Sequence, residues 1–362
     1  MRVTVNQSIL SNALGKVQSA VSSKTTLAIL NNILVEAKDG HLTLTATDLE
    51  QSISTTLPVN VDTEGVTTIP AKKFVSIVRQ LANEDLTLEI DDNDIASIRC
   101  GHSFYKIQGI DATAYPTEEA IDQSRELTLN NILLKKMLNK ISYSISSDET
   151  RHVLNGILLT VREGTLTAVA TDGRRLALME TIIEADSSLD GDTILPSKAV
   201  NELQKLLIVD GEVQISLGDA RAEFTVGDTR LRTKILEGNF PNFRQVIPAN
   251  FSQEVAIPRE KLSVALQRVS VILSDSSAAI KLSMEPTELV VSAHSNTDES
   301  TEIIEMAYEN EPIAISFNPQ FISDPLKKLE CDNIVIKFND KISPIGVFGD
   351  EGFLYVIMPM RN

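Results

Sequence analysis

The sequence predicts an α+β fold made of three similar domains in a row. Two observations carry this prediction: a long internal repeat, and one order of helices and strands shared by each copy. Four segments of the first copy return 124 to 126 positions later, namely LNNIL (30–34) as LNGIL (154–158), ATD (46–48) as ATD (170–172), IPAK (69–72) as LPSK (195–198) and YP (115–116) as FP (240–241). A third, more diverged copy follows, with LVVSA at 289–293 standing 123 positions after LTAVA at 166–170.

An interval this long indicates duplicated domains, because solenoid repeats are only about 20–50 residues long. A chain of 362 residues has room for two or three domains. We therefore expect three domains, at 1–120, 121–248 and 249–362.

Each copy opens with a short strand, at 2–5 in the first and 126–129 in the second. Apolar residues at helical spacing then predict a first helix in each copy, at 8–21, 131–145 and 259–273. Strands with tight turns follow, and Asp39-Gly40 and Glu163-Gly164 occupy matching hairpin positions. A second helix is predicted at 71–81, 197–207 and 319–329, and further strands, including 86–90, 95–99 and 105–109, close the unit. Such a unit places its helices on one face of its sheet.

One residue departs from this pattern. Pro325 falls inside the second helix of the third copy. Proline lacks the backbone N–H that a helix interior needs, so we expect this helix to be kinked or shortened.

The charge is distributed unevenly along the chain. The formal net charge is −17, yet the six predicted helical segments hold 14 basic and 3 acidic residues, whereas the remainder holds 19 basic and 47 acidic ones. Lys and Arg are good helix formers on solvated faces, but Glu is equally good and is nearly absent. The distribution favours a basic surface that faces phosphates, with an acidic remainder that discourages DNA from binding elsewhere.

Helix dimensions indicate how such a surface could enclose DNA. Six helices packed about 9 Å apart around a ring give a circumference of roughly 54 Å and a bore of only about 7 Å. Twelve give roughly 108 Å and a bore near 25 Å, which admits a hydrated duplex. A ring therefore predicts two chains.

An enzyme is the main alternative class. Asp48 and Asp172 stand at equivalent repeat positions and could serve as catalytic carboxylates, but Asp after a strand more often caps a turn. The four histidines have no metal-ligand spacing; they are His41, His102, His152 and His294. The sequence has neither a Walker-type phosphate loop nor a nucleophile elbow. We therefore expect no catalytic residues, metal or cofactor.

A third class is a monomeric, β-rich scaffold that binds peptides only. It predicts no dimer and no salt-sensitive association with DNA, and the charge distribution favours the DNA-encircling ring. Cys100 and Cys331 occupy unmatched positions, so we expect no disulfide and a reducing cytoplasm. No apolar run reaches about 18 residues, so we expect no membrane span.

Three segments carry a resemblance to a known family: ATDGRRLA at 170–177, LEGNFP at 236–241 and YVIMPMR at 355–361. With them the whole chain resembles the bacterial DNA polymerase III beta subunit, the sliding clamp. The resemblance implies three clamp domains per chain and a head-to-tail dimeric ring of six domains, with helices lining the hole and sheets outside. It also implies a non-catalytic processivity factor that binds double-stranded DNA without reading sequence. The implied partners are the replicative polymerase, the clamp loader, other polymerases and repair proteins.

The resemblance further implies a pocket between the second and third domains that binds short linear motifs of these partners. The matching positions are Leu154, Thr171, Gly173, Arg174, Arg175, Leu176, Pro241, Val246, Asn318, Phe321, Pro344, Val356, Met358, Pro359, Met360 and Arg361. Leu, Val, Pro and Met make an adaptable apolar trough, and Arg can orient a peptide and any acidic group it carries. Gln245 and Phe321 stand where some relatives have Arg and Tyr, and Asn362 replaces the apolar residue that often follows the Arg, so the resemblance implies the pocket and leaves its partner preference open.

Two further surfaces follow from the resemblance. The joint between chains maps onto Ile77, Tyr105 and Ile107 on one chain and onto Ile272 and Leu273 on the other, and such a joint should have an apolar centre and a charged rim. The resemblance adds two loop residues as DNA contacts, and the basic helices add seven more. These candidates are Lys24, Arg151, Lys72, Lys73, Arg79, Lys136, Lys198, Lys205 and Arg268, expected to act as point charges on phosphates.

Overall fold

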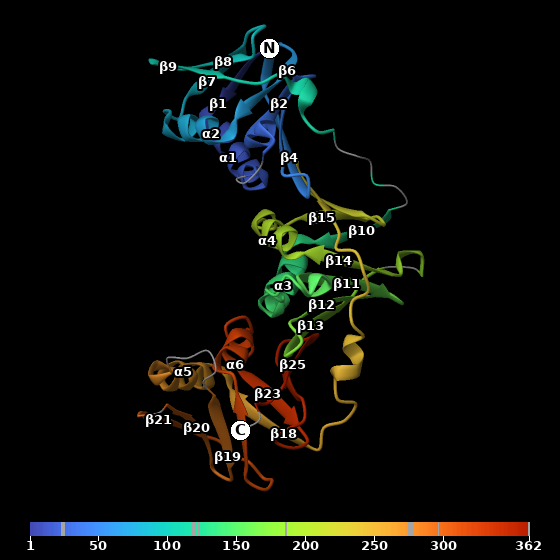
Figure 1. The fold of residues 1–362 in the computed structure, drawn as a ribbon, viewed down its shortest axis with the longest axis vertical. Coiled ribbons are helices and arrows are strands. Elements are labelled where there is room, and N and C mark those ends of the chain that lie inside the picture. Colours follow the sequence, from blue (N-terminus) through green and yellow to red (C-terminus); the bar gives the residue numbers. More distant parts are fainter. Residues whose placement is uncertain are drawn as a thin grey trace. The chain divides into compact units, whose positions relative to one another are not determined.

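The computed structural model describes residues 1–22, 26–117, 121, 124–184, 187–273, 279–295 and 297–360 (Figure 1). Three residues named above lie outside these ranges: Lys24, Arg361 and Asn362. The chain divides into two compact units, one formed by 1–135 with 201–235 and the other by 136–200 with 236–362. Each unit is described below by itself.

The first unit contains a five-stranded and an eight-stranded sheet with antiparallel neighbours. The five-stranded sheet runs β5 (Asn60–Thr63), β1 (Arg2–Asn6), β7 (Asp85–Ile90), β8 (Ile95–Cys100) and β9 (Ser103–Gln108). The eight-stranded sheet runs β10 (Arg125–Asn130), β15 (Glu212–Leu217), β16 (Arg221–Val226), β17 (Thr229–Lys234), β4 (Gln51–Pro58), β3 (His41–Thr47), β2 (Asn32–Lys38) and β6 (Gly65–Pro70). Its helices are α1 (Gln7–Val17) and α2 (Ala71–Gln80).

The second unit has an eight-stranded sheet in the order β14 (Gly191–Pro196), β11 (Gly156–Arg162), β12 (Thr165–Thr171), β13 (Arg175–Ile182), β25 (Phe353–Ile357), β24 (Ile345–Phe348), β23 (Asn333–Phe338) and β18 (Gln253–Pro258). A four-stranded sheet runs β21 (Glu299–Glu305), β20 (Glu288–His294), β19 (Ile280–Glu285) and β22 (Ile313–Phe317). Its helices are α5 (Arg259–Val269) and α6 (Pro319–Leu326). The division between the units passes through α3 (Asn131–Ile141) and α4 (Ser197–Leu206).

The predicted order of elements is confirmed in each copy: a strand, a helix, hairpin strands, a second helix and closing strands. The first helices are shorter than predicted, because α1, α3 and α5 pass into single 3₁₀ turns at Gln18–Ala20, Ser142–Ser144 and Ser270–Ile272. Other 3₁₀ turns lie at Ala28–Asn31, Ala112–Ala114, His152–Leu154, Ser187–Leu189 and Phe243–Val246. Among the described residues, no helix is long and apolar enough to cross a membrane.

The two predicted hairpin turns are confirmed. Asp39 and Gly40 both have positive φ (49° and 73°), and Glu163 and Gly164 repeat these values (49° and 75°). Two successive residues at positive φ form the turn whose twist matches a right-handed hairpin.

The predicted effect of Pro325 is also confirmed. α6 ends at Leu326, three residues before the predicted end, and has 8 residues against 10 or 11 in the other helices. A residue other than proline at this position would donate its N–H to the carbonyl of Phe321, four residues earlier. That carbonyl finds another donor, described below.

Candidate peptide-binding site

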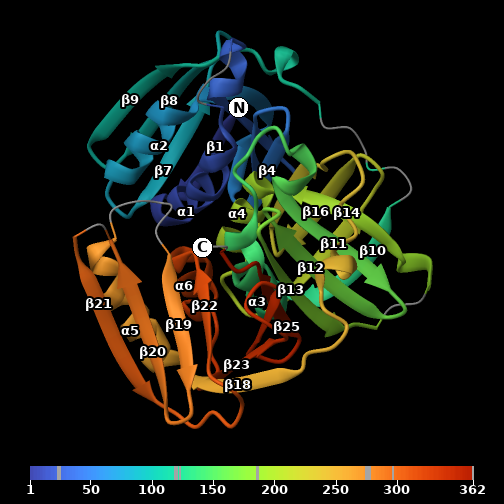
Figure 2. The same cartoon turned by 60° about the horizontal axis from the view of Figure 1, so that its bottom comes forward.

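The framework of the site is the pairing of β13 with β25, which joins the strands of the second and third copies into one sheet (Figure 2). Leu176 and Val356 are direct cross-strand partners, 3% exposed each. They belong to a buried cluster that also contains Leu158, Val169, Leu178 and Ile194, against which Val153, Leu236, Phe240, Phe243, Ile247 and Leu354 pack partly buried. The sheet therefore presents an apolar floor at this junction.

A cavity of about 260 Å³ opens beside this floor. It is lined by Leu158, Thr160, Arg162, Asp192, Phe240, Pro241, Asn242, Phe243 and Arg244. Three apolar residues of the predicted pocket remain open to solvent: Val246 is 48% exposed, Met358 is 43% exposed, and Pro241, which lines the cavity, is also exposed. A buried apolar floor with an exposed, flexible Met at its edge suits an apolar peptide side chain.

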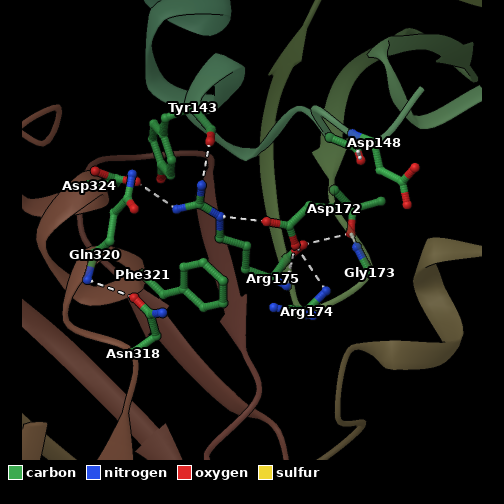
Figure 3. Close-up of polar contacts among 12 residues, drawn as sticks. Tyr143, Asp148, Asp172, Gly173, Arg174, Arg175, Asn318, Gln320, Phe321 and Asp324 are labelled. Atoms are coloured by element: carbon green, nitrogen blue, oxygen red, sulfur yellow. Dashed lines mark hydrogen bonds and ion pairs between the residues drawn. The ribbon is translucent and has the colours of Figure 1, made fainter. Parts of the chain in front are cut away.

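Figure 3 shows that Arg175 is the best-connected side chain of the site. It is only 8% exposed. Its Nε donates to Asp172 Oδ2 at 3.0 Å and its Nη1 to Asp324 Oδ2 at 2.7 Å. Its Nη2 donates to the carbonyl of Tyr143 at 2.7 Å. Its guanidinium carbon lies 4.5 Å from the ring centroid of Phe321. The guanidinium of Arg175 is thus bonded to groups of its own chain, and it holds the walls of the site in place.

The shortened helix α6 is tied into the same network. The hydroxyl of Tyr355 donates to the carbonyl of Phe321 at 2.7 Å, which is the acceptor that Pro325 leaves without a helical donor. Tyr355 is fully buried, and its ring lies 5.9 Å from that of Tyr143. Burial raises the pKa of both phenols above the ordinary value, against the lowering effect of the nearby Arg175 cation.

The prediction that Asp172 caps the turn before β13 is confirmed. Asp172 Oδ1 accepts the backbone N–H groups of Arg174 and Arg175 at 2.9 and 3.0 Å, and Asp48 Oδ1 makes the same pair of bonds in the first copy. Thr171 Oγ1 donates to the carbonyl of Arg175 and accepts the N–H of Gly173, whose φ is +84°. The turn leaves Arg174 exposed.

The chain end lies against this turn. Met358 N–H donates to the carbonyl of Arg174 at 3.1 Å, and Met360 N–H donates to the carbonyl of Ser316 at 2.8 Å. Asn318 caps α6, since its Oδ1 accepts the N–H of Gln320 at 2.9 Å. The other predicted residues are Leu154, which is 7% exposed, and Phe321, Pro344 and Pro359, which are half-buried. The described residues of the predicted pocket thus all belong to the second unit.

Sequence reasoning missed a second set of ionic contacts beside the site. Lys140 is 2% exposed and pairs with Asp350, whose carboxylate also accepts the N–H of Cys331 at 2.9 Å. Lys136 pairs with Glu330 at 3.4 Å. Burial, together with the neighbouring Lys136, lowers the pKa of the Lys140 ammonium, while Glu330 raises it. Only the i, i+4 spacing of the two lysines hinted at a shared acidic partner.

Eight of the predicted DNA contacts are described. Lys72, Lys73 and Lys198 are exposed on α2 and α4. Five candidates have these neighbours: Arg79 contacts Gln18, Lys136 Glu330, Arg151 Asp148, Lys205 Glu202 and Arg268 Glu302. Lys205 and Arg268 remain 65% and 64% exposed, so their partners leave them open to phosphates.

The residues predicted for the chain joint lie on an edge strand, on helix α2 and just after helix α5. Tyr105 is 38% exposed on β9, the edge of the five-stranded sheet, while Ile107 on the same strand is 3% exposed. Ile77 on α2 is half-buried, as are Ile272 and Leu273 just after α5. α5 packs against β21, the edge of the four-stranded sheet. Edge strands expose unpaired backbone groups and can pair with another chain.

Three exposed apolar residues near these edges were not predicted: Phe104 (45% exposed), Val271 (82%) and Ile303 (59%). The alternation in ESTEIIE at 299–305 could have revealed Ile303, because it puts an isoleucine on the same face as polar residues.

Comparison with known proteins covers the full chain. Family models of the DNA polymerase III beta subunit match with its N-terminal domain at 1–119, its central domain at 128–242 and its C-terminal domain at 244–361. The beta sliding clamp of Chlamydia muridarum is 32% identical over 362 residues, which covers 100% of this chain and 99% of the relative. That of Vibrio cholerae is 28% identical over 366 residues, with 100% of both chains covered.

Solved structures are similar over the same extent. The sliding clamp of Bartonella birtlesii, bound to griselimycin, has a TM-score of 0.95 at 31% identity, with 100% of both chains covered. The clamp of Bacillus subtilis has a TM-score of 0.96 at 27% identity, with 100% of this chain and 99% of that chain covered.

Proposed function

This chain belongs to the DNA polymerase III beta subunit family, the beta sliding clamps, and we propose that two copies close head to tail into a ring around duplex DNA. A sliding clamp is a non-catalytic processivity factor of DNA replication. The observation that carries the DNA-facing part of the proposal is the concentration of basic residues on the helices of a chain whose net charge is −17. The monomeric scaffold gives no reason for that concentration.

The proposed mechanism is topological. A closed ring stays on DNA without strong contacts, and a polymerase docked on it is held at high local concentration. Each docking contact can then be weak, with a Kd near the micromolar range, or about −8 kcal/mol.

The proposed docking site is the groove built on Leu176, Val356 and the Arg175 network. Its apolar floor would take apolar side chains of a linear motif, and exposed Arg174 would meet an acidic group. We assign to it the replicative polymerase, the clamp loader, other polymerases and repair proteins. The proposed domains are 1–120, 121–248 and 249–362.

The proposed joint pairs the surface of Ile77, Tyr105 and Ile107 on one copy with that of Ile272 and Leu273 on the other. Exposed Phe104 and Ile303 would add apolar area beside it. The proposed DNA contacts are sequence-independent, so neutralising Lys72, Lys73 and Lys198 should flatten the salt dependence of DNA binding by about 0.9 per lost phosphate contact.

Sedimentation equilibrium tests the joint directly. The wild-type chain should sediment as a dimer, and Ile272→Asp with Leu273→Asp should give a soluble monomer, because two desolvated carboxylates would lack partners. The matched control is Ile182→Asp with Ile208→Asp, which changes two isoleucines that are 87% and 69% exposed elsewhere. A dimer in the joint variant, or a monomer in the control, would contradict the assignment.

A further inference from the structure

The groove on β13 and β25 has a repeat counterpart within the first unit. β4 pairs with β17 in the same register as β13 with β25: Gln51 faces Thr233 as Arg175 faces Ile357. The shared register, with the 124-residue repeat, makes each position of one junction comparable with one position of the other.

A cavity of about 290 Å³ lies at this counterpart. It is lined by Thr45, Thr47, Leu49, Glu50, Gln51, Ser52, Tyr115, Pro116, Thr117, Arg221, Arg232 and Lys234. Pro116 is the repeat equivalent of Pro241, and Thr47 that of Thr171. The backbone frame of the peptide groove is therefore present twice in the chain.

The side chains of the second cavity have changed character. Ser52 stands at the position of Leu176, Arg232 at that of Val356, Lys234 at that of Met358 and Arg221 at that of Pro344, by the strand pairings of the two sheets. An apolar floor has become a polar and cationic one. An apolar peptide side chain that fits the first groove would be rejected here, because it would desolvate these cations.

These cations share one face of the sheet. Arg221 and Lys234 are direct cross-strand partners, and Arg232 lies two residues before Lys234 on the same strand. Arg232 is 13% exposed and is held by Glu223, to which its Nε donates at 2.9 Å. Lys234 is 43% exposed, and its partner Glu50, at 3.1 Å, is 69% exposed and can swing away. Among the described residues, the lining holds three cations and the carboxylate of Glu50, and Glu223 pairs with Arg232 from outside the lining. The described groups therefore leave one more cation than carboxylate in a strongly acidic chain.

We propose that this second groove binds a short acidic peptide segment in an extended conformation, with a carboxylate held between Arg221 and Lys234. The choice of a peptide rests on the proposed function of the first groove, whose backbone frame the second shares. The choice of acidic side chains rests on the lining cations alone, since Arg and Lys bind carboxylates by charge-assisted hydrogen bonds.

The test uses a fluorescein-labelled, N-acetylated and C-amidated hexaglutamate as the probe, with fluorescence anisotropy in low salt on the full chain. Hexaglutamine is the uncharged control. Arg221→Gln with Lys234→Gln should weaken hexaglutamate binding by about tenfold or more. Lys38→Gln with Lys281→Gln removes two exposed cations outside both grooves and should change it less than about twofold.

Equal loss in both variants would reduce the effect to general attraction by charge and overturn the proposal. So would the absence of binding to the wild-type chain. Displacement of the probe by inorganic phosphate at the same molar concentration would identify a small-anion site and overturn the claim for a peptide. The clamp-binding linear motif of the cognate replicative polymerase, as a peptide, separates this test from that of the first groove. It should bind both variants like wild type, and its failure to bind would count against the first groove only.

Discussion

The two repeat-related junctions share a backbone and differ in the residue at their centre. Arg175 ties Asp172 and Asp324 together with two short hydrogen bonds. Gln51 takes the same place after the same capped turn, at Asp48, but among the described residues neither its Oε1 nor its Nε2 has a partner, although the side chain is 3% exposed. Duplication has thus kept the strand register and the turn, while Arg175, the centre of the ionic network at one junction, is replaced by a neutral amide at the other.

The helices that pack near these junctions differ in a matching way. α6 contains Pro325, and the carbonyl of Phe321, which this proline leaves without a helical donor, accepts a hydrogen bond from Tyr355. The positions equivalent to Pro325 and Tyr355 hold Leu203 on α4 and Leu231 on β17, and both are buried. The second unit thus has a hydrogen bond where the first has two buried leucines. The two junctions should therefore respond in opposite ways to similar substitutions.

The largest effect is expected for Arg175→Met. The change leaves the carboxylates of Asp172 and Asp324 and the carbonyl of Tyr143 without their donor in a buried site. Removal of one partner of a buried ion pair costs about 3 kcal/mol or more. Thermal denaturation should show that Tm falls by about 6–12 °C. Arg174→Met changes the exposed neighbouring residue and is the control. Its free energy of unfolding should stay within about 0.5 kcal/mol of the wild-type value. A similar loss of stability in both variants would contradict the role of the network.

Alkaline pH should weaken the second unit next. Burial raises the pKa of Tyr143 and Tyr355 in the folded state above the unfolded value of about 10. The unfolded chain therefore loses these protons first, so stability is unaffected below pH 10 and falls as pH rises above it, by about 1.4 kcal/mol per pH unit for each phenol. Denaturant titrations between pH 9 and 11 measure this slope, and Tyr355→Phe should make it shallower. An unchanged slope would contradict the burial of this phenol.

A smaller effect is expected from Tyr355→Phe at neutral pH. It removes the donor to the carbonyl of Phe321 and should cost about 1 kcal/mol. In the Pro325→Ala background the helix can supply its own N–H to that carbonyl, so the cost should fall below about 0.5 kcal/mol. A double-mutant cycle measures the coupling, and additive losses would show that the two groups do not share this acceptor.

The smallest effect, of opposite sign, is expected for Gln51→Met. It replaces a buried, unpaired amide by an apolar side chain of similar shape and should stabilise the protein by up to about 1 kcal/mol. Gln7→Met is the matched control, because Gln7 is also buried but donates to the carbonyl of Val78 at 2.6 Å, so its loss should destabilise. Calorimetry of both variants checks the signs, and destabilisation by Gln51→Met would mean that the amide has a partner.

Sequence alone could predict the features that depend on local chemistry. The repeat gave the order of elements, glycine after Asp39 and Glu163 gave the hairpins, and the Asp of each ATD segment gave the capped turns. Pro325 predicted that α6 would be short, because proline lacks the backbone N–H that a helix interior needs. Each of these depends on residues a few positions apart.

The features that could not be predicted from the sequence depend on contacts between distant segments. The partner of the carbonyl freed by Pro325 lies 34 residues away from it, and that of Lys140 lies 210 residues away. Nothing local marks these pairs. The Arg175 pocket residues were named through family resemblance, and only the structure showed that this arginine is already engaged.

The most direct test of the clamp function is retention on nicked circular DNA compared with the same DNA linearised, after loading by the cognate loader and a wash in high salt. Salt removes electrostatic binding, so only a closed ring that cannot slide off an end should remain. We expect retention on the circle, loss from the linear form, and loss from both for the Ile272→Asp, Leu273→Asp variant. Equal loss of the wild-type chain from both forms, with an active loader, would contradict encirclement and favour the peptide-binding scaffold.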